Sequence, residues 1–302
     1  MTATPFRLGI DLGGTKIAGV VLGPDGAIAA SHTIASPQHD YAATLDAIGH
    51  VVAQLEQSVA ASCSVGVGMP GSLSPATGLV QNANSTWLNG RPFDRDLEKR
   101  LNRPVRFAND ANCFALSEAT DGAAASAPTV FGVILGTGTG GGIVIDGRIL
   151  NGPRGIGGEW GHIPLPWPTP DERAVAPCWC QRHGCLETWI SGSGLAADHT
   201  RVTGQRLRAE AIVAAASAGD AHAQATLDRH AHRLARGLAM ITNLIDPHVI
   251  VLGGGLSALP HLYETVPALM APYVFSGTPA VTIRPPKWGP TSGVRGAAWL
   301  WE

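Results

Sequence analysis

Two stretches of this chain, one near its start and one near its middle, repeat the same pattern. Residues 7–22 read RLGIDLGGTKIAGVVL and residues 130–145 read VFGVILGTGTGGGIVI; when Leu12 is aligned with Leu135, Gly13 falls on Gly136 and Gly19 on Gly142. Each stretch consists of an apolar run, a turn rich in glycine and threonine, and a second apolar run, which is typical of a β-hairpin. A repeat at this distance predicts two domains of one fold that arose by duplication.

The segments around both hairpins alternate between apolar strands and helical patterns. Further strands are expected at residues 27–34, 64–68, 104–108 and 248–252, and helices at residues 41–60, 94–101, 111–120, 207–217 and 221–245. Strands that alternate with helices form α/β layers with partly parallel sheets. The length of 302 residues also favours two domains, because single cores usually stop growing below that size.

The composition excludes several classes of protein. Charged residues make up 15% of the chain and the net charge is −2, so nothing indicates binding to nucleic acid or to an anionic membrane. The N-terminal residues lack the pattern of a signal peptide, and no apolar run is long enough to span a bilayer. We therefore expect a cytoplasmic protein whose thiols stay reduced.

The two glycine-rich turns are candidates for phosphate binding. Glycine lets an anion approach the backbone, whose N–H groups can then donate hydrogen bonds to it. One such turn is usually only a turn, but two matched copies favour a polyphosphate held between them, although neither matches the P-loop or dinucleotide-binding pattern. The candidate residues are Asp11, Gly13, Gly14, Thr15 and Lys16 in the first copy and Gly136, Thr137, Gly138, Thr139 and Gly140 in the second.

Two further features are consistent with a bound nucleotide. Asp11, at the end of the first strand, suits a hydrated Mg²⁺ on the phosphates, unless it only caps a turn and Lys16 is only a solvated charge. A third glycine run follows the expected strand at 248–252, where adenosine could lie against the backbone or where the chain could simply turn tightly. This run is Gly253, Gly254 and Gly255.

The stretch FANDAN at residues 107–112 places an acid where a strand ends and a helix begins. Asp110 is either the cap of that helix or, since active sites of α/β proteins lie at strand ends, a general base for phosphoryl transfer to an alcohol. The flanking amides of Asn109 and Asn112 could hold neighbouring hydroxyls. Asn84 is a further amide candidate, with an ordinary loop asparagine as the alternative.

Three of the five cysteines lie close together in CWCQRHGCLE, residues 178–187. Clustered cysteines in a reducing compartment indicate a metal site more than disulfides. Cys178, Cys180 and Cys185 with the upstream His162 make a closed tetrahedral set that suits structural Zn²⁺. His183 is the alternative fourth ligand, and reduced core cysteines are the alternative to a metal.

Two glutamates lie beside these ligands. Glu159 precedes His162 by three residues, and Glu187 follows Cys185 by two. A metal would tie both carboxylates to one rigid point, and fixed carboxylates are good acceptors for sugar hydroxyls. We call residues 178–185 with His162 the knuckle, and we interpret it as the wall of a sugar pocket. The alternative for either glutamate is a solvated surface charge.

These motifs together resemble the ROK family of bacterial sugar kinases and repressors. The resemblance rests on LGIDLGGTK at 8–16, the second hairpin near 136–142, GEWGH at 158–162 and CWCQRHGCLE at 178–187, and it extends to GVRGAAWL at 293–300. It implies an α/β fold of duplicated actin/hexokinase-like (ribonuclease H-like) domains, with an interdomain cleft for ATP and sugar and a small zinc knuckle. The last helix, near 293–301, would pack back on the N-terminal domain.

The resemblance also implies a role for each matching residue. Asp110 would be the catalytic base, and His162 would ligate zinc through one ring nitrogen and face the sugar with the other. The sugar-binding residues would be Gly71, Asn84, Asn109, Asp110, Glu159, His162 and Glu187. The zinc ligands would be His162, Cys178, Cys180 and Cys185. Gln181 departs from the family, which usually has glycine there, and this bears on the geometry of the knuckle turn.

The resemblance finally predicts domains and subtype. Residues 1–115, joined by a helix at 291–302, would form the N-terminal domain, and residues 116–290 the C-terminal domain with the zinc knuckle and an oligomerisation surface. A homodimer is expected.

The first strand begins near Phe6, which leaves no room for the DNA-binding domain of the repressors. QNANSTWLNGRPF at 81–93 and GEWGHIPLPW at 158–167 look most like the manno/fructokinase type, so we expect a kinase acting on O6 of fructose with ATP and Mg²⁺. The alternatives are N-acetylglucosamine, glucose or mannose as the sugar, or a catalytically silent sugar-binding regulator.

Overall fold

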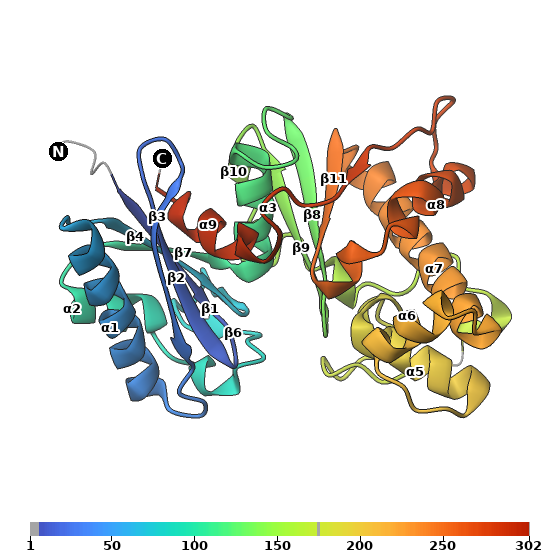
Figure 1. The fold of residues 1–302 in the computed structure, drawn as a ribbon, viewed down its shortest axis with the longest axis horizontal. Coiled ribbons are helices and arrows are strands. Elements are labelled where there is room, and N and C mark those ends of the chain that lie inside the picture. The colour runs from blue at the N-terminus through green and yellow to red at the C-terminus, as the bar shows by residue number, and fades with distance from the viewer. Residues whose placement is uncertain (1–5, 174–175, 302) are drawn as a thin grey trace. The chain divides into compact units, whose positions relative to one another are not determined.

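The structure is a computed structural model that describes residues 6–173 and 176–301 (Figure 1). The described residues contain two five-stranded sheets. The first has the strand order β3-β2-β1-β4-β7 and the second β10-β9-β8-β11-β12. The first sheet is formed by β1 (Arg7–Leu12), β2 (Lys16–Leu22), β3 (Ile28–Ala35), β4 (Ser64–Met69) and β7 (Val105–Asn109). The second is formed by β8 (Thr129–Leu135), β9 (Thr139–Ile145), β10 (Arg148–Ile149), β11 (Val249–Gly253) and β12 (Ile283–Arg284).

The two sheets confirm the repeat seen in the sequence. The hairpins match residue for residue, since β1 and β8 end at the aligned Leu12 and Leu135, and β2 and β9 begin at the aligned Lys16 and Thr139. In the first sheet β1 is parallel to β4 and β4 to β7; in the second, β8 is parallel to β11 and β11 to β12. The same order of strands in both sheets supports duplication of one unit.

The helices expected from the sequence are present, and the structure adds others. The α-helices of the described residues are α1 (Tyr41–Val59), α2 (Phe93–Leu101), α3 (Asp110–Thr120), α4 (Glu187–Ile190), α5 (Gly192–Thr203), α6 (Ala209–Ser217), α7 (Ala221–Ile245), α8 (His261–Met270) and α9 (Ser292–Ala298). We did not predict α4, α5 or α8. Within the described residues, no helix has the length and apolar character that crossing a bilayer requires.

The chain forms two compact units whose boundaries differ from the predicted domains. The first comprises Met1–Ser126, Gly142–Gly158 and Lys287–Glu302, and the second Ala127–Gly141 and Glu159–Pro286. The first unit keeps α3 whole, because buried Glu118 near its end accepts hydrogen bonds from the start of the C-terminal segment. Compact units are not the same as independently folding domains, so the predicted boundary at residues 115–116 stays a prediction.

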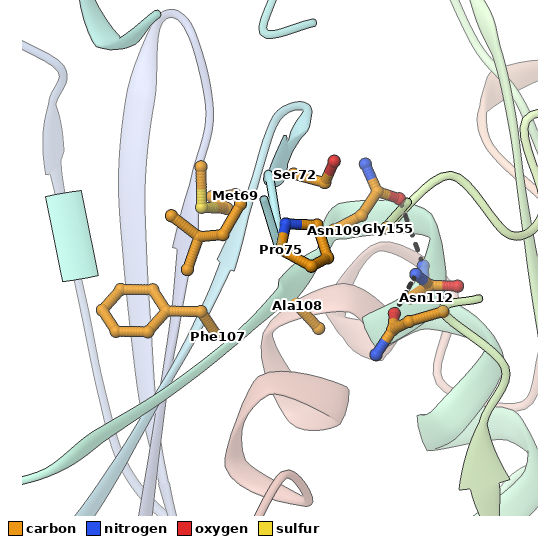
Figure 2. A pocket seen from close by; sticks show the side chains of 10 residues that line it. Met69, Ser72, Pro75, Phe107, Ala108, Asn109, Asn112 and Gly155 are labelled. Carbon is orange, nitrogen blue, oxygen red and sulfur yellow. Dashed lines mark hydrogen bonds between the residues drawn. The ribbon is translucent and has the colours of Figure 1, made fainter. Parts of the chain in front are cut away.

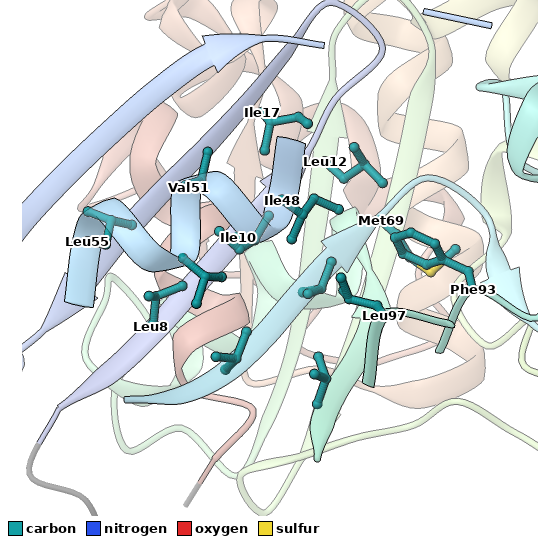
Figure 3. Packing of buried hydrophobic residues seen from close by; sticks show 14 of the residues in the cluster. Leu8, Ile10, Leu12, Ile17, Ile48, Val51, Leu55, Met69, Phe93 and Leu97 are labelled. Atoms are coloured by element: carbon teal, nitrogen blue, oxygen red, sulfur yellow. The ribbon is translucent and has the colours of Figure 1, made fainter. Parts of the chain in front are cut away.

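The core of the first unit lies between its sheet and α1 (Figure 3). Ile48, Val51 and Leu55 of α1 are fully buried against strand residues such as Ile10 and Ile17. Each such side chain contributes about 1.5–3 kcal/mol through burial. On the other face, α9 packs so closely that a methyl group on Gly9 of β1 or Gly66 of β4 would overlap its backbone. The sheet edge that carries the candidate site is therefore fixed from both faces.

Candidate functional site

The carboxyl ends of three parallel strands of the first sheet bring candidate residues to one edge. In the register of this sheet, Asp11 of β1 lies opposite Gly68, and Met69 of β4 lies opposite Asn109 of β7. Asp110 follows directly as the first residue of α3. Because parallel strands end at the same edge, Asp11, Asn109 and Asp110 belong to one site region.

Asn109, and not Asp110, caps α3. The Asn109 side-chain oxygen accepts hydrogen bonds from the backbone N–H groups of Ala111 (2.9 Å) and Asn112 (3.4 Å). Its Nδ2 donates to the backbone oxygen of Gly71 at 3.1 Å. Asp110 lies inside the first turn, where its Oδ1 accepts from Ala111 N at 2.8 Å. The capping role that was the alternative interpretation of Asp110 is thus performed by its neighbour.

The electrostatics of this edge favour the neutral form of both acids. Burial raises the pKa of Asp110 above its usual range. Burial, followed by the charge of Asp110, raises the pKa of Asp11 to about 6, while Lys16 opposes the shift. A carboxylate whose pKa is raised towards neutrality suits proton transfer better than an ordinary surface acid.

A cavity of about 170 Å³ adjoins Asn109 within the first unit (Figure 2). Its wall is partly apolar and partly made of amide and hydroxyl groups. It is lined by Met69, Ser72, Leu73, Pro75, Phe107, Ala108, Asn109, Asn112, Asn151 and Gly155. Asn112 donates from Nδ2 to Asn151 Oδ1 at 3.2 Å, which ties α3 to the loop after β10. Sequence reasoning missed Ser72 and Asn151, for which the sequence offers no motif, and it named Asn112 only as an amide flanking Asp110.

The turn of each hairpin has a distinct conformation. In the first, Gly13 N donates to Lys16 O at 3.0 Å, and residues 14–16 are exposed. In the second, Gly136 N donates to Gly138 O at 3.0 Å, and Gly136 O accepts from Gly192 N at the start of α5 (2.7 Å). Asn84 is exposed on the loop after β6 (Val80–Gln81).

The third glycine run lies beside the second hairpin. Gly254 has φ +82°, and a Cβ there would lie 2.5 Å from the backbone oxygen of Leu135, the last residue of β8. Only glycine fits both this backbone conformation and this close approach. The structure therefore places Gly253, Gly254 and Gly255 next to the turn that begins at Gly136.

The cysteine knuckle brings four candidate metal ligands together. The ligand atoms of His162, Cys178, Cys180 and Cys185 all lie within 4.8 Å of one another. Cys178 Sγ is 3.6 Å from His162 Nδ1, and Cys180 Sγ is 3.5 Å from Cys185 Sγ. Three sulfur atoms and one imidazole nitrogen fit the closed tetrahedral set that structural Zn²⁺ prefers. The group does not include the alternative His183, which is exposed.

The position of Gln181 shows what its departure from the family pattern means. Gln181 lies in the knuckle turn with φ +69°, in the left-handed region that favours glycine. Its backbone N–H still donates to Cys178 O at 2.9 Å, so the turn closes. The ligand set is preserved, and the side chain at this position makes the turn less favourable.

Glu187 is bonded through both carboxylate oxygens. Oε2 accepts from the backbone N–H of Thr139 at 2.9 Å, and Oε1 accepts from the indole N–H of Trp179 at 2.8 Å. It is therefore not the solvated surface charge that was its alternative. His162 directs Nδ1 towards Cys178, which leaves Nε2 for a second partner. Glu159 is exposed and precedes the 3₁₀ helix η2 (Trp160–His162).

The predicted site residues are divided between the two units. The first unit contains Asp11, Gly13, Gly14, Thr15, Lys16, Gly71, Asn84, Asn109 and Asp110. The second contains Gly136, Thr137, Gly138, Thr139, Gly140, Glu159, His162, Cys178, Cys180, Cys185, Glu187, Gly253, Gly254 and Gly255. The cleft expected between the two halves stays a prediction.

Curated relatives correct the predicted subtype. The chain is 37% identical to an N-acetyl-D-glucosamine kinase of Pasteurella multocida (strain Pm70), over 98% of this chain and 99% of the relative. It is 36% identical to a protein of the same name from Vibrio vulnificus (strain YJ016), over 97% and 98%. These relatives contradict fructokinase, the subtype we expected from residues 81–93 and 158–167. That expectation was wrong because the resemblance of two short segments outweighed the rest of the chain.

Solved structures and the family pattern agree on the fold. A ROK hexokinase from Thermus thermophilus superposes with a TM-score of 0.86 at 31% identity, covering 97% of this chain and 96% of that one. A ROK family glucokinase from Streptomyces griseus, in complex with glucose and AMPPNP, gives 0.79 at 28% identity, covering 98% of both chains. The predicted actin/hexokinase-like α/β fold is confirmed. Since the ROK family pattern matches residues 7–302, the chain belongs to the ROK family.

Proposed function

We propose that this protein is an ATP-dependent hexose kinase, with N-acetyl-D-glucosamine as its substrate. The names of the curated relatives support this choice of sugar, and the glucokinase solved with glucose and AMPPNP supports the pairing of a hexose with a nucleotide. The observation that carries the proposal is the placement of Asp110, an acid with a raised pKa at the carboxyl end of β7.

The chemistry assigned to Asp110 is that of a general base. Its carboxylate accepts the proton of the 6-hydroxyl while the hydroxyl oxygen forms a bond to the γ-phosphorus of ATP and the bond to the leaving ADP breaks. Asn109 is held by Gly71 O and can orient a neighbouring hydroxyl. Glu159, His162 and Glu187 are the candidate sugar contacts of the second unit.

The nucleotide is assigned to the glycine-rich turns. Backbone N–H groups of residues 13–16 and 136–140 are the candidate donors to its phosphates, and residues 253–255 are the candidate support for its adenosine. Asp11 suits Mg²⁺, because a cation would offset the burial and the Asp110 charge that raise its pKa. The magnesium, when bound, would neutralise phosphate charge.

Zinc is assigned a structural role only. The ligands are Cys178, Cys180, Cys185 and His162, which leave no open coordination position for a reacting group. The metal would hold the knuckle next to Glu187. The homodimer and the cytoplasmic location expected from the sequence stay predictions.

A coupled assay of ADP release over a panel of sugars tests the proposal. The panel comprises N-acetylglucosamine, N-acetylmannosamine, glucose, mannose and fructose. We expect kcat/KM to be highest for N-acetylglucosamine. A tenfold or greater preference for another hexose would overturn the choice of sugar, and no turnover with any of them would overturn the kinase.

A further inference from the structure

A buried ion cluster in the second unit holds a segment that begins at His162, one of the candidate zinc ligands. Glu172, which is 6% exposed, accepts hydrogen bonds from Arg233 Nε at 2.7 Å and from both Nη atoms of Arg236 at 2.8 Å. Arg233 and Arg236 are one turn apart on α7 and are 1% and 5% exposed. The two arginines therefore bind α7 to the residues around Glu172, which are distant from α7 in the sequence.

Arg236 also holds the backbone of the same segment. Its Nη1 donates to the backbone oxygen of Trp167 at 2.6 Å, and a longer contact of 3.5 Å reaches that of Pro166. Glu172 in turn accepts from the backbone N–H of Thr169 at 3.0 Å, which closes the turn between them. The guanidinium and the carboxylate therefore fix residues 166–172 onto α7.

Residues 163–165, which directly precede the residues held by α7, pair with the cysteine knuckle. Leu165 N donates to Gly184 O at 3.1 Å, and Leu186 N donates to Ile163 O at 2.8 Å. Pro164 and Cys185 are bridged in the same antiparallel pairing. We call residues 162–172 the segment. It begins at the candidate ligand His162, pairs with the knuckle beside the candidate ligand Cys185, and ends at Glu172.

From this continuity we propose that Glu172, held by Arg233 and Arg236, is a positioning residue for the metal knuckle. We call the contacts of Arg233 and Arg236 with Glu172 the clamp. The clamp fixes the far end of the segment, and His162 and Cys185 therefore keep their ligand geometry. The inference rests on the zinc site assigned above but not on kinase activity. Buried ion pairs usually add little net stability over apolar packing, which favours a role in geometry.

The same cluster offers a matched control. Asp198 of α5, 3% exposed, accepts from Arg201 at 2.6 Å, from Arg229 at 2.7 Å and from Arg233 at 3.0 Å. Asp198→Asn and Glu172→Gln each remove one buried negative charge without changing side-chain size. Asp198 shares Arg233 with Glu172, but among the described residues its ion-pair partners lie on α5 and α7, and it makes no ion pair with Arg236.

The test measures zinc content and the rate of zinc release to a chromogenic chelator from the full-length protein. We expect about one zinc per wild-type chain, release at least about tenfold faster from Glu172→Gln, and release within about twofold of wild type from Asp198→Asn. Arg236→Lys, which keeps the charge but loses the forked donor, serves if Glu172→Gln does not fold. We expect it to release zinc several-fold faster.

Two results would overturn the clamp. One is that Glu172→Gln, or Arg236→Lys in its place, releases zinc no faster than Asp198→Asn does, which would leave Glu172 without a specific effect on the knuckle. The other is a wild-type chain that holds no zinc. A lack of kinase turnover would overturn the proposed function while leaving the zinc measurement intact, so the two failures are distinguishable.

Discussion

The backbone N–H of Thr139 donates a hydrogen bond to Oε2 of Glu187 at 2.9 Å. This contact joins the first residue of β9, beside a glycine-rich turn, to the first residue of α4. The other Glu187 oxygen accepts from Trp179 in the knuckle. One carboxylate therefore connects the candidate phosphate turn to the candidate zinc site.

Glu187→Gln should weaken this connection, because one of the two oxygens becomes an NH₂ group that cannot accept a hydrogen bond. Loss of one such bond to a charged group costs about 1.5–3 kcal/mol. We expect KM for the sugar to rise about tenfold or more. Glu210→Gln, an exposed acid on α6, is the control in the same steady-state assay and should leave KM unchanged. A Glu187→Gln variant with wild-type KM would remove Glu187 from sugar binding.

Asp11→Asn should stabilise the protein near neutral pH while impairing its activity. The pKa of Asp11 is raised to about 6 from an ordinary 3.8, so the folded state holds the proton more tightly than the unfolded state. That stabilisation is fully present below pH 3.8 and is lost as pH rises through about 6. At pH 7.5 the charged Asp11 opposes folding by about 3 kcal/mol, a cost that the amide avoids.

Urea unfolding at two pH values checks this sign. We expect Asp11→Asn to exceed wild type in free energy of unfolding at pH 7.5 and to match it closely at pH 4. If Asp11→Asn is less stable than wild type at pH 7.5, the charge of Asp11 in the wild-type protein is compensated in the folded state.

Gln181→Gly should stabilise the knuckle turn. The backbone conformation at φ +69° destabilises the folded state by about 1–2 kcal/mol when the residue has a Cβ. Glycine removes this strain, but its greater conformational entropy in the unfolded state offsets part of the gain. We expect a net gain of about 1 kcal/mol in thermal or denaturant unfolding. Gln181→Ala keeps the Cβ and is the matched control, with no gain expected. Equal stability of both variants would indicate that the turn relaxes without strain.

Gly254→Ala should raise KM for ATP more than KM for the sugar. A Cβ at this position would meet the backbone oxygen of Leu135 at 2.5 Å, so the glycine run must move away from β8. We expect an increase of about tenfold, the effect of a displacement worth about 1.4 kcal/mol. Gly277→Ala, where a Cβ meets nothing within 4 Å, is the control. An unchanged KM for ATP would separate this run from nucleotide binding.

Much of the fold follows from local patterns, and the misses have identifiable causes. The two hairpins and α1 were predicted because their apolar periodicity matches what the sheets bury. The helix α5 was missed because its first residues, GSG, are typical of a turn; it begins there because Ser191 caps it and Gly192 N bonds to Gly136 O. The helix α8 was missed because it contains Pro267.

The site was predictable where its residues are neighbours in sequence. The four metal-ligand candidates lie close in the chain, and their spacing sufficed to find them. The contact between Glu172 and Arg236 joins residues 64 positions apart, and no local pattern indicates which buried arginine meets which acid. Asn109 as the cap of α3 was equally hidden, because either residue of the Asn-Asp pair can cap a helix.

The most direct test of the central claim, that Asp110 is the base of a hexose kinase, is Asp110→Asn assayed for turnover and for sugar binding on the same preparation. Loss of a general base lowers rates about 10²–10⁴-fold. We predict a fall in kcat of that size, with sugar affinity by calorimetry within a fewfold of wild type. A variant that retains near-wild-type kcat would contradict the account.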